Sequence, residues 1–216
     1  MIPRFEIEVD PSFPAGADIG MPPEDEISEE GYGYFRDVWD ISGATRAEAV
    51  SVIEGERRLV DLMDRASTTW EEFETLAVAV EMGDPEALPS DFAERYPDSE
   101  LVEIVGDGEM DKPVLTGLDV GVAGLAWALS SIGCFPAASC RGHLGERPWT
   151  DRPVVFFAAE PVTVHWLTHL VRESGCGFAD GGERGRLLIV EAPSISNLMD
   201  LAFRIVDQAE RQSYRG

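Results

Sequence analysis

Apolar residues recur with helical spacing in the first half of the chain. Thr45 precedes Glu48 by three residues, which is the spacing of a capping box, where a hydroxyl and a carboxylate satisfy free backbone amides at a helix start. A second helix is predicted to begin at Thr69 and to end at Gly83. The apolar stripe of the first helix consists of Ala49, Val52, Ile53, Leu59, Val60 and Met63.

Beyond residue 100 the apolar segments are shorter and are separated by glycine and proline. Leu101–Val105 is predicted to be a short strand. Thr116 and Asp119 repeat the capping pattern, with aspartate in place of glutamate, at the start of a mostly apolar helix. The predicted helices cover 120–132, 161–174 and 194–212, and the further predicted strands cover 136–139, 154–158 and 187–190, with a glycine-rich hairpin at 175–185.

The order of these elements predicts the fold class. With one strand in the hairpin segment 175–185, the order after residue 116 is helix, strand, strand, helix, strand, strand, helix, which predicts an α+β domain with one small sheet and helices on one of its faces. Residues 1–30 combine prolines with an acidic run and show no period. We therefore expect an extended or mobile acidic arm over 1–30, an acidic helical region over 31–100, and the α+β domain over 101–216.

The chain is strongly acidic, and its charge is uneven. The formal net charge is −24. Residues 1–110 hold 29 acidic and 7 basic residues, whereas residues 111–216 hold 12 acidic and 10 basic residues. Such a field repels phosphate backbones, so direct nucleic-acid binding is not expected. The acidic half is interpreted first as a solvated surface, and the alternative is a face that binds a basic protein.

Length, hydropathy and cysteine count are those of an ordinary globular protein. The 216 residues suffice for one well-formed core, and 44% of them are hydrophobic. No apolar run approaches the ~20 residues of a membrane span, and the start of the chain lacks the pattern of a signal peptide. Three cysteines without an export signal favour reduced thiols. We expect an intracellular, cytoplasmic protein of prokaryotic type with no membrane partner.

All cysteine and histidine residues lie in the C-terminal half, and the densest group is one short turn. Cys140 and His143 are three residues apart, which suits either a thiolate–imidazole pair or two ligands of one metal ion. As a catalytic pair, Cys140 would be the nucleophile and His143 its base. Arginine offers a fork for a carboxylate or phosphate, and glycine permits close approach of a ligand. The candidate ligand-binding residues are therefore Ser139, Arg141 and Gly142.

A second pair of histidines extends the candidate metal site. His165 and His169 are four residues apart, so they share one face of the predicted helix. Trp166 stands where the glutamate of a His-Glu-x-x-His motif would be, which argues against a metalloprotease. Cys134 and Cys176 are interpreted as small buried apolar residues. The candidate ligands of one metal ion, with zinc as the candidate cofactor, are Cys140, His143, His165 and His169.

One stretch of the chain resembles known proteins. It carries Leu-Asp-x-Gly at 118–121, Ser-Cys-x-Gly-His at 139–143 and an apolar strand at 154–157. In these features residues 115–160 resemble a group of uncharacterised bacterial and phage proteins with a helix, a Ser-Cys-x-Gly-His turn and a short aromatic strand. This resemblance implies a shared turn with a shared ligand site. The turn is also similar to that of the wybutosine-tRNA-modifying methyltransferase family, whose motif has a basic residue in place of His143.

The leading functional hypothesis is centred on the turn 139–143. It is small-ligand or metal binding, with a thiol-dependent enzyme as the catalytic form. The alternative is an acidic protein-binding or immunity-type protein that acts on a basic partner through residues 1–110. A methyltransferase-like RNA modifier is the third hypothesis, and the acidic charge argues against its substrate. No Gly-Lys-Ser/Thr triplet and no Gly-x-Ser-x-Gly elbow is present, so the common nucleotide-binding and hydrolase classes are not indicated.

Overall fold

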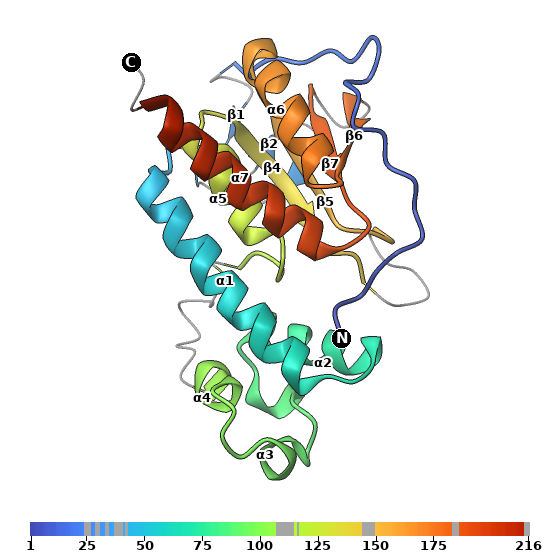
Figure 1. Cartoon of the computed structure of the whole chain (residues 1–216), viewed down its shortest axis with the longest axis vertical. Coiled ribbons are helices and arrows are strands. Elements are labelled where there is room, and N and C mark those ends of the chain that lie inside the picture. The colour runs from blue at the N-terminus through green and yellow to red at the C-terminus, as the bar shows by residue number, and fades with distance from the viewer. Residues whose placement is uncertain are drawn as a thin grey trace.

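A computed structural model gives the fold of the chain. Helices cover one face of a four-stranded sheet, and the N-terminal segment runs along the outside (Figure 1). The residues that the structure describes are 1–23, 27–28, 31–32, 35–36, 41, 43–106, 115, 117–143, 150–182 and 186–213.

The two long helices of the N-terminal half form as the sequence predicts. Helix α1 spans Arg46–Ala66 and begins with the complete capping box, because the Thr45 side chain accepts from the Glu48 N–H and the Glu48 carboxylate accepts from the Thr45 N–H. Helix α2 spans Trp70–Met82. Gly83 ends it with a φ of +59°, the left-handed conformation that glycine adopts without strain. The prediction of both helices is confirmed.

The beginning of the predicted helical region is a different kind of structure. Three short strands form a small antiparallel sheet. The first lies in the predicted arm, and the other two lie where helix was predicted from residue 31 onward. Glycine and aromatic residues are frequent in this segment, and they disfavour helix and favour strands, respectively. The strands are β1 (Ile27–Ser28), β2 (Gly31–Tyr32) and β3 (Phe35–Arg36). The short helices between α2 and residue 100 are η2 (Pro85–Ala87) and α3 (Phe92–Arg95).

The strand predicted at 101–105 is wrong, because this segment is helix α4 (Leu101–Gly106). Leu101 and Val105 are both fully buried, whereas Val102 is 38% exposed. A spacing of four residues between buried positions is that of a helix face. A short apolar run cannot by itself distinguish a strand from a buried turn of helix, and here packing against α1 and α2 decides the outcome.

The C-terminal half has the predicted order of elements, and the α+β fold is confirmed. All neighbouring strands of its sheet are antiparallel, in the order β4-β5-β7-β6. The strands are β4 (Phe135–Cys140), β5 (Val154–Ala158), β6 (Gly177–Asp180) and β7 (Leu188–Glu191). The helices are α5 (Ala123–Ser131), α6 (Pro161–Glu173) and α7 (Ile195–Ser213).

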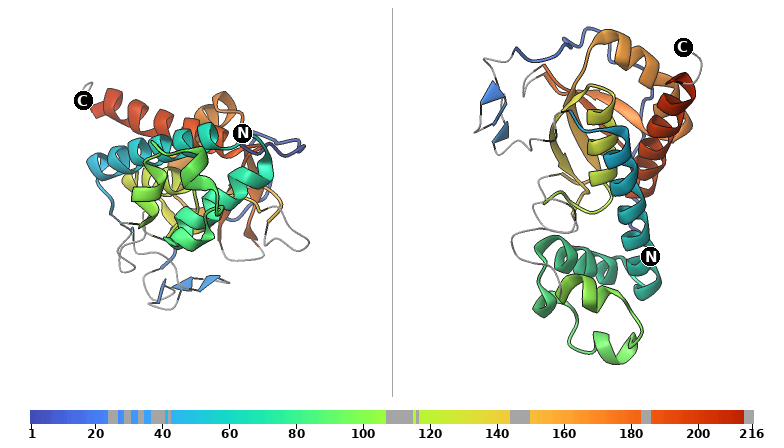
Figure 2. Two further views of the ribbon diagram at one scale, coloured as in Figure 1. Left: turned by 90° about the horizontal axis from the view of Figure 1, so that it is seen from below. Right: turned by 90° about the vertical axis from the view of Figure 1, so that its left-hand side faces the viewer.

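The main core lies between the sheet and the helices (Figure 2). Alternate residues of β5 point to opposite faces, so that Val155 and Phe157 pack against the helices while Phe156 belongs to a smaller cluster on the other face. Ala49 and Ile53 of α1 lie in the same core as the sheet residues. Helix α1 is therefore packed directly on the α+β half of the chain. Among the described residues, no helix has the length and apolar character that crossing a membrane requires.

The described part of the N-terminal arm follows an extended path along the molecule. The Phe5 N–H donates to the Pro193 carbonyl at 2.8 Å, and the Phe178 N–H donates to the Asp10 carbonyl at 2.7 Å. Ile19 packs against the main core. The two backbone contacts hold the part of the arm from Phe5 to Asp10 beside β6 and the start of α7, whereas the Met1 amino group pairs with Asp64 near the end of α1. The division of the chain into three separate segments stays a prediction.

Candidate functional site

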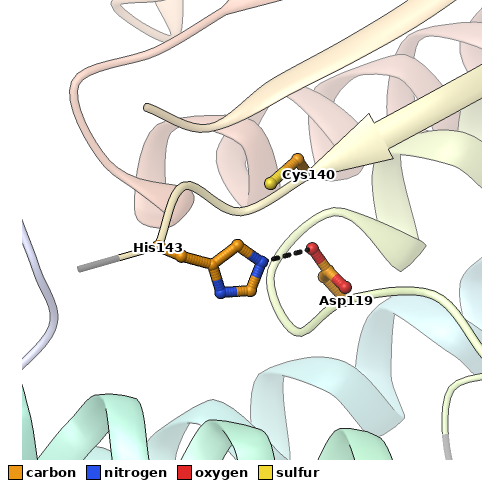
Figure 3. A group of neighbouring side chains, drawn as sticks. All are labelled: Asp119, Cys140 and His143. Atoms are coloured by element: carbon orange, nitrogen blue, oxygen red, sulfur yellow. Dashed lines mark ion pairs between the residues drawn. The ribbon is translucent and has the colours of Figure 1, made fainter. Parts of the chain in front are cut away.

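The candidate site lies at the C-terminal end of β4, where the chain makes a tight turn. Cys140 is the last residue of the strand, and Gly142 follows with a φ of +76°. A Cβ at Gly142 would lie 2.8 Å from backbone atoms of Arg152, so no larger residue fits without a backbone shift. This glycine turns the chain so that His143 comes back toward Cys140 (Figure 3).

Three ligand-type side chains converge at this turn. Asp119, Cys140 and His143 each offer one ligand atom, and these atoms all lie within 4.8 Å of one another. His143 Nε2 is 3.5 Å from Asp119 Oδ2 (Figure 3). The thiol is buried, whereas the Asp119 and His143 side chains are 28% and 34% exposed. The three residues together form a group that could hold a metal ion.

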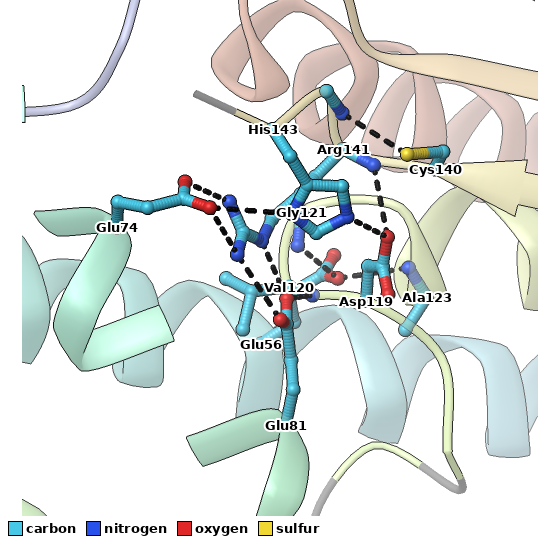
Figure 4. Close-up of polar contacts among 11 residues, drawn as sticks. Glu56, Glu74, Glu81, Asp119, Val120, Gly121, Ala123, Cys140, Arg141 and His143 are labelled. Atoms are coloured by element: carbon cyan, nitrogen blue, oxygen red, sulfur yellow. Dashed lines mark hydrogen bonds and ion pairs between the residues drawn. The ribbon is translucent and has the colours of Figure 1, made fainter. Parts of the chain in front are cut away.

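Asp119 is available to the site because it does not cap α5. The sequence predicted that it would, but α5 begins later, at Ala123. The acceptor at this helix start is Glu56 of α1, whose carboxylate accepts from the N–H groups of Gly121 and Ala123, both at 2.9 Å (Figure 4). It also accepts from the Gly124 N–H at 3.1 Å. The capping prediction is therefore wrong at Asp119, and its other partner, at 116, lies outside the described residues.

Backbone groups of the turn donate hydrogen bonds to two of the three side chains. The Gly142 N–H donates to Cys140 Sγ at 3.4 Å, and the Arg141 N–H donates to Asp119 Oδ2 at 3.2 Å. The turn thus supplies Cys140 and His143 and also orients Asp119, which comes from a loop 21 residues earlier in the chain. The Arg141 N–H favours the negatively charged form of the Asp119 carboxylate.

The Arg141 guanidinium contacts protein carboxylates. Its side chain is 2% exposed and lies between two glutamates of α2. Nε donates to Glu81 at 2.6 Å, Nη2 donates to both glutamates at 3.2 Å, and Nη1 pairs with Glu74 (Figure 4). Glu74 also lies 3.2 Å from His143 Nδ1. The guanidinium that the sequence predicted to bind a ligand is thus paired with carboxylates of α2.

Negative groups surround His143 and favour a positive charge at its position. Hydrogen bonds to Asp119, Cys140 and Glu74, in decreasing order of effect, raise the pKa of His143 to about 11. Burial raises the pKa of Asp119, but hydrogen bonds from His143 and Arg141 outweigh it, and the pKa of Asp119 lies below its usual value. The site is therefore suited to a cation between the imidazole ring and Asp119.

The other sequence-predicted ligands lie elsewhere. His165 and His169 are exposed on α6, and in the described part of the chain no metal-type group includes either of them. Cys134 and Cys176 are buried in the main core, where burial raises the pKa of both thiols to about 12. Ser139 is half-buried in β4, where it pairs with β5. The turn thus joins Cys140 and His143, but it joins them to Asp119 instead of to the helix histidines.

Sequence reasoning missed Asp119 and Glu74. The signal for Asp119 was present in the Leu-Asp-x-Gly motif at 118–121, but its spacing to Thr116 favoured a helix cap. Glu74 had no local signal, because it is one of many acidic residues in the helical region. Comparison with known proteins adds no further site residue, since no protein-family model, curated protein or solved structure matches this chain. The family resemblance of residues 115–160 stays a prediction.

Proposed function

We propose that this protein binds one divalent transition-metal ion, of the zinc class, through Asp119, Cys140 and His143. The observation that carries the proposal is the convergence of a carboxylate oxygen, a thiol sulfur and an imidazole nitrogen within 4.8 Å of one another. These are the ligand types that zinc takes in proteins. Three protein ligands leave a fourth tetrahedral position for water or substrate, which is the arrangement of catalytic zinc sites.

The groups around the ligands support this proposal. The N–H groups of Gly142 and Arg141 donate to Cys140 and Asp119, and hydrogen bonds of this kind orient metal ligands. A bound zinc ion would neutralise the two negative ligands and would lower the pKa of a water molecule in the open position to about 7. The residues of the site would then orient that water for hydrolytic chemistry.

A thiol enzyme with His143 as its base has less support from the same geometry. In a cysteine–histidine pair, a protonated histidine beside the thiol stabilises the thiolate, so the high pKa of His143, about 11, is compatible with either chemistry. The thiol enzyme needs only Cys140 and His143, whereas the metal site uses all three converging side chains. A metal ion near Nε2 would take the place of the proton on that nitrogen and would use the same carboxylate, Asp119, that now faces it at 3.5 Å.

Metal content tests the proposal directly. The full chain, without an affinity tag, is incubated with zinc, separated from free metal and assayed by elemental mass spectrometry. We expect about one equivalent of zinc in the wild type and its loss in Cys140→Ser and Asp119→Asn, since each change removes one of three ligands. Cys134→Ala and His165→Ala serve as controls, because they remove a thiol and an imidazole that lie away from the turn.

The control variants decide the outcome. Zinc retained by the controls and lost from the ligand variants supports the site at Asp119, Cys140 and His143. A wild type that binds no zinc, or a Cys140→Ser variant that binds as much as the wild type, rules this site out. Loss of zinc in His165→Ala would restore the ligand set that the sequence predicted.

A further inference from the structure

The face of α2 that meets the turn carries two glutamates, and only one of them reaches a metal-type side chain. Glu74 Oε1 is 3.2 Å from His143 Nδ1, and Glu74 also pairs with Arg141. Glu81 lies two helical turns further along α2, pairs with the same arginine and accepts from the Val120 N–H at 2.8 Å. The two glutamates therefore share one partner but differ in their contact with His143.

We propose that Glu74 is the positioning residue of the metal site, which orients His143 through Nδ1 and so makes α2 part of the site. This inference rests on the proposed zinc site. A histidine that binds a metal through one ring nitrogen donates the N–H of the other nitrogen to a carboxylate or carbonyl, which fixes the ring and raises its basicity as a ligand. In this structure Nε2 faces Asp119 and Nδ1 faces Glu74, so the ring already has that orientation.

Glu74 is itself held in place by the turn that carries the ligands. Arg141 stands directly after Cys140, its side chain is 2% exposed, and it binds both oxygens of Glu74. The Glu74 side chain is 17% exposed, so water competes with its partners only weakly. Docking of α2 and orientation of His143 thus depend on the same carboxylate. Zinc binding and the packing of α2 on the turn should therefore favour each other.

The paired variants Glu74→Gln and Glu81→Gln separate orientation of His143 from a general effect on Arg141. Each change removes one of the two negative charges that pair with Arg141. In Glu81→Gln the side-chain oxygen can still accept the hydrogen bond from the Val120 N–H. Zinc affinity of the full chain is measured by competition with a chelator of known affinity. We expect Glu74→Gln to weaken zinc binding about tenfold, at the low end of the 10–100-fold typical of such residues, because the amide oxygen still accepts. We expect Glu81→Gln to stay within about twofold of the wild type.

Equal loss in both variants would assign the effect to Arg141 and overturn the role of Glu74, as would an unchanged affinity in Glu74→Gln. Both outcomes require a wild type that binds zinc, so they are distinct from failure of the site itself. A measurement on the zinc-loaded wild type covers the case in which Glu74→Gln does not fold. Nitrogen NMR of His143 should show Nε2 bound to the metal and Nδ1 protonated, and the reverse assignment overturns the proposal.

Discussion

At the scale of single residues, the geometry of the turn depends on Gly142. Its φ of +76° is a conformation that residues with a Cβ rarely adopt, and the Arg152 backbone occupies the space that a Cβ would need. A positive φ alone would allow asparagine or aspartate, but the close backbone approach excludes them as well. Cys140 and His143 can meet only because this position is glycine.

Gly142→Ala should therefore destabilise the protein by more than the strain of a positive φ alone, which is about 1–2 kcal/mol. Gly133→Ala is the matched control, since Gly133 has a φ of +82° but nothing within 4 Å of its Cβ position. The free energy of unfolding in urea gives the comparison. Equal losses in the two variants would show that the Arg152 contact relaxes easily.

Glu56 of α1 places a buried carboxylate against the start of α5. Its pKa predicts that the stability of the protein depends on pH. Burial outweighs the three N–H donors and raises the pKa of Glu56 from 4.5 to about 7. The folded state then binds more protons than the unfolded state between these values, so the contribution of Glu56 to stability falls as pH rises from about 4.5 to about 7. In Glu56→Gln this part of the pH dependence should disappear.

Urea denaturation of the wild type and of Glu56→Gln at a series of pH values checks this. As pH rises from about 4.5 to about 7, the unfolding free energy of the wild type should fall relative to that of Glu56→Gln. Outside this range the difference between the two proteins should be constant. Glu54→Gln, on the exposed side of α1, is the control and should follow the wild type at every pH. A constant difference for Glu56→Gln would mean that the N–H donors keep the carboxylate ionised throughout.

At the scale of elements, the Arg141 side chain joins β4 to α2. The contact brings together residues 60 and 67 positions apart, and it buries one positive and two negative groups. Buried ion pairs of this kind contribute little net energy compared with apolar packing, but breaking one leaves charges without partners. Part of the acidic charge of the helical region is thus internal.

Arg141→Ala should reduce the free energy of unfolding by about 3–5 kcal/mol, because Glu74 and Glu81 would then lie partly buried without their cation. Arg95→Ala removes an arginine from an exposed pair with Glu72 and should have a much smaller effect. Chemical denaturation of both variants gives the comparison. Similar losses would mean that water replaces the contact at Arg141.

At the scale of the whole molecule, the net charge determines which charged partners the protein attracts or repels. The net charge of −24 gives a repulsive field toward phosphate backbones. A basic protein partner stays a prediction, and Glu56, Glu74 and Glu81 are not available to it because they have internal partners.

We expect no retention of duplex DNA or tRNA by the protein at low ionic strength, where electrostatic attraction is strongest. Gel shift or filter binding at 50 mM salt or below checks this, with a basic protein of similar size as the positive control. Binding that weakens steeply with added salt would contradict this expectation and favour the RNA-modifying hypothesis.

The sequence by itself determined the elements whose signals are local. Thr45 and Glu48 are three residues apart, so their capping of α1 depends only on local sequence. Pro161 begins α6, because the first N–H of a helix has no acceptor within the helix and its absence in proline therefore costs nothing. The location of the site could also be predicted from local sequence, since Cys140 and His143 belong to one turn. The order of strands and helices followed from such signals, and the α+β class followed from the order.

Only the tertiary structure decided which distant residues complete the site. Asp119 faces His143 because Glu56, from another helix, takes the capping role that local spacing gave to Asp119. Glu74 reaches the turn because Arg141, the residue after β4, pairs with α2. No local pattern contains these contacts, since many carboxylates compete for few cations and packing selects among them.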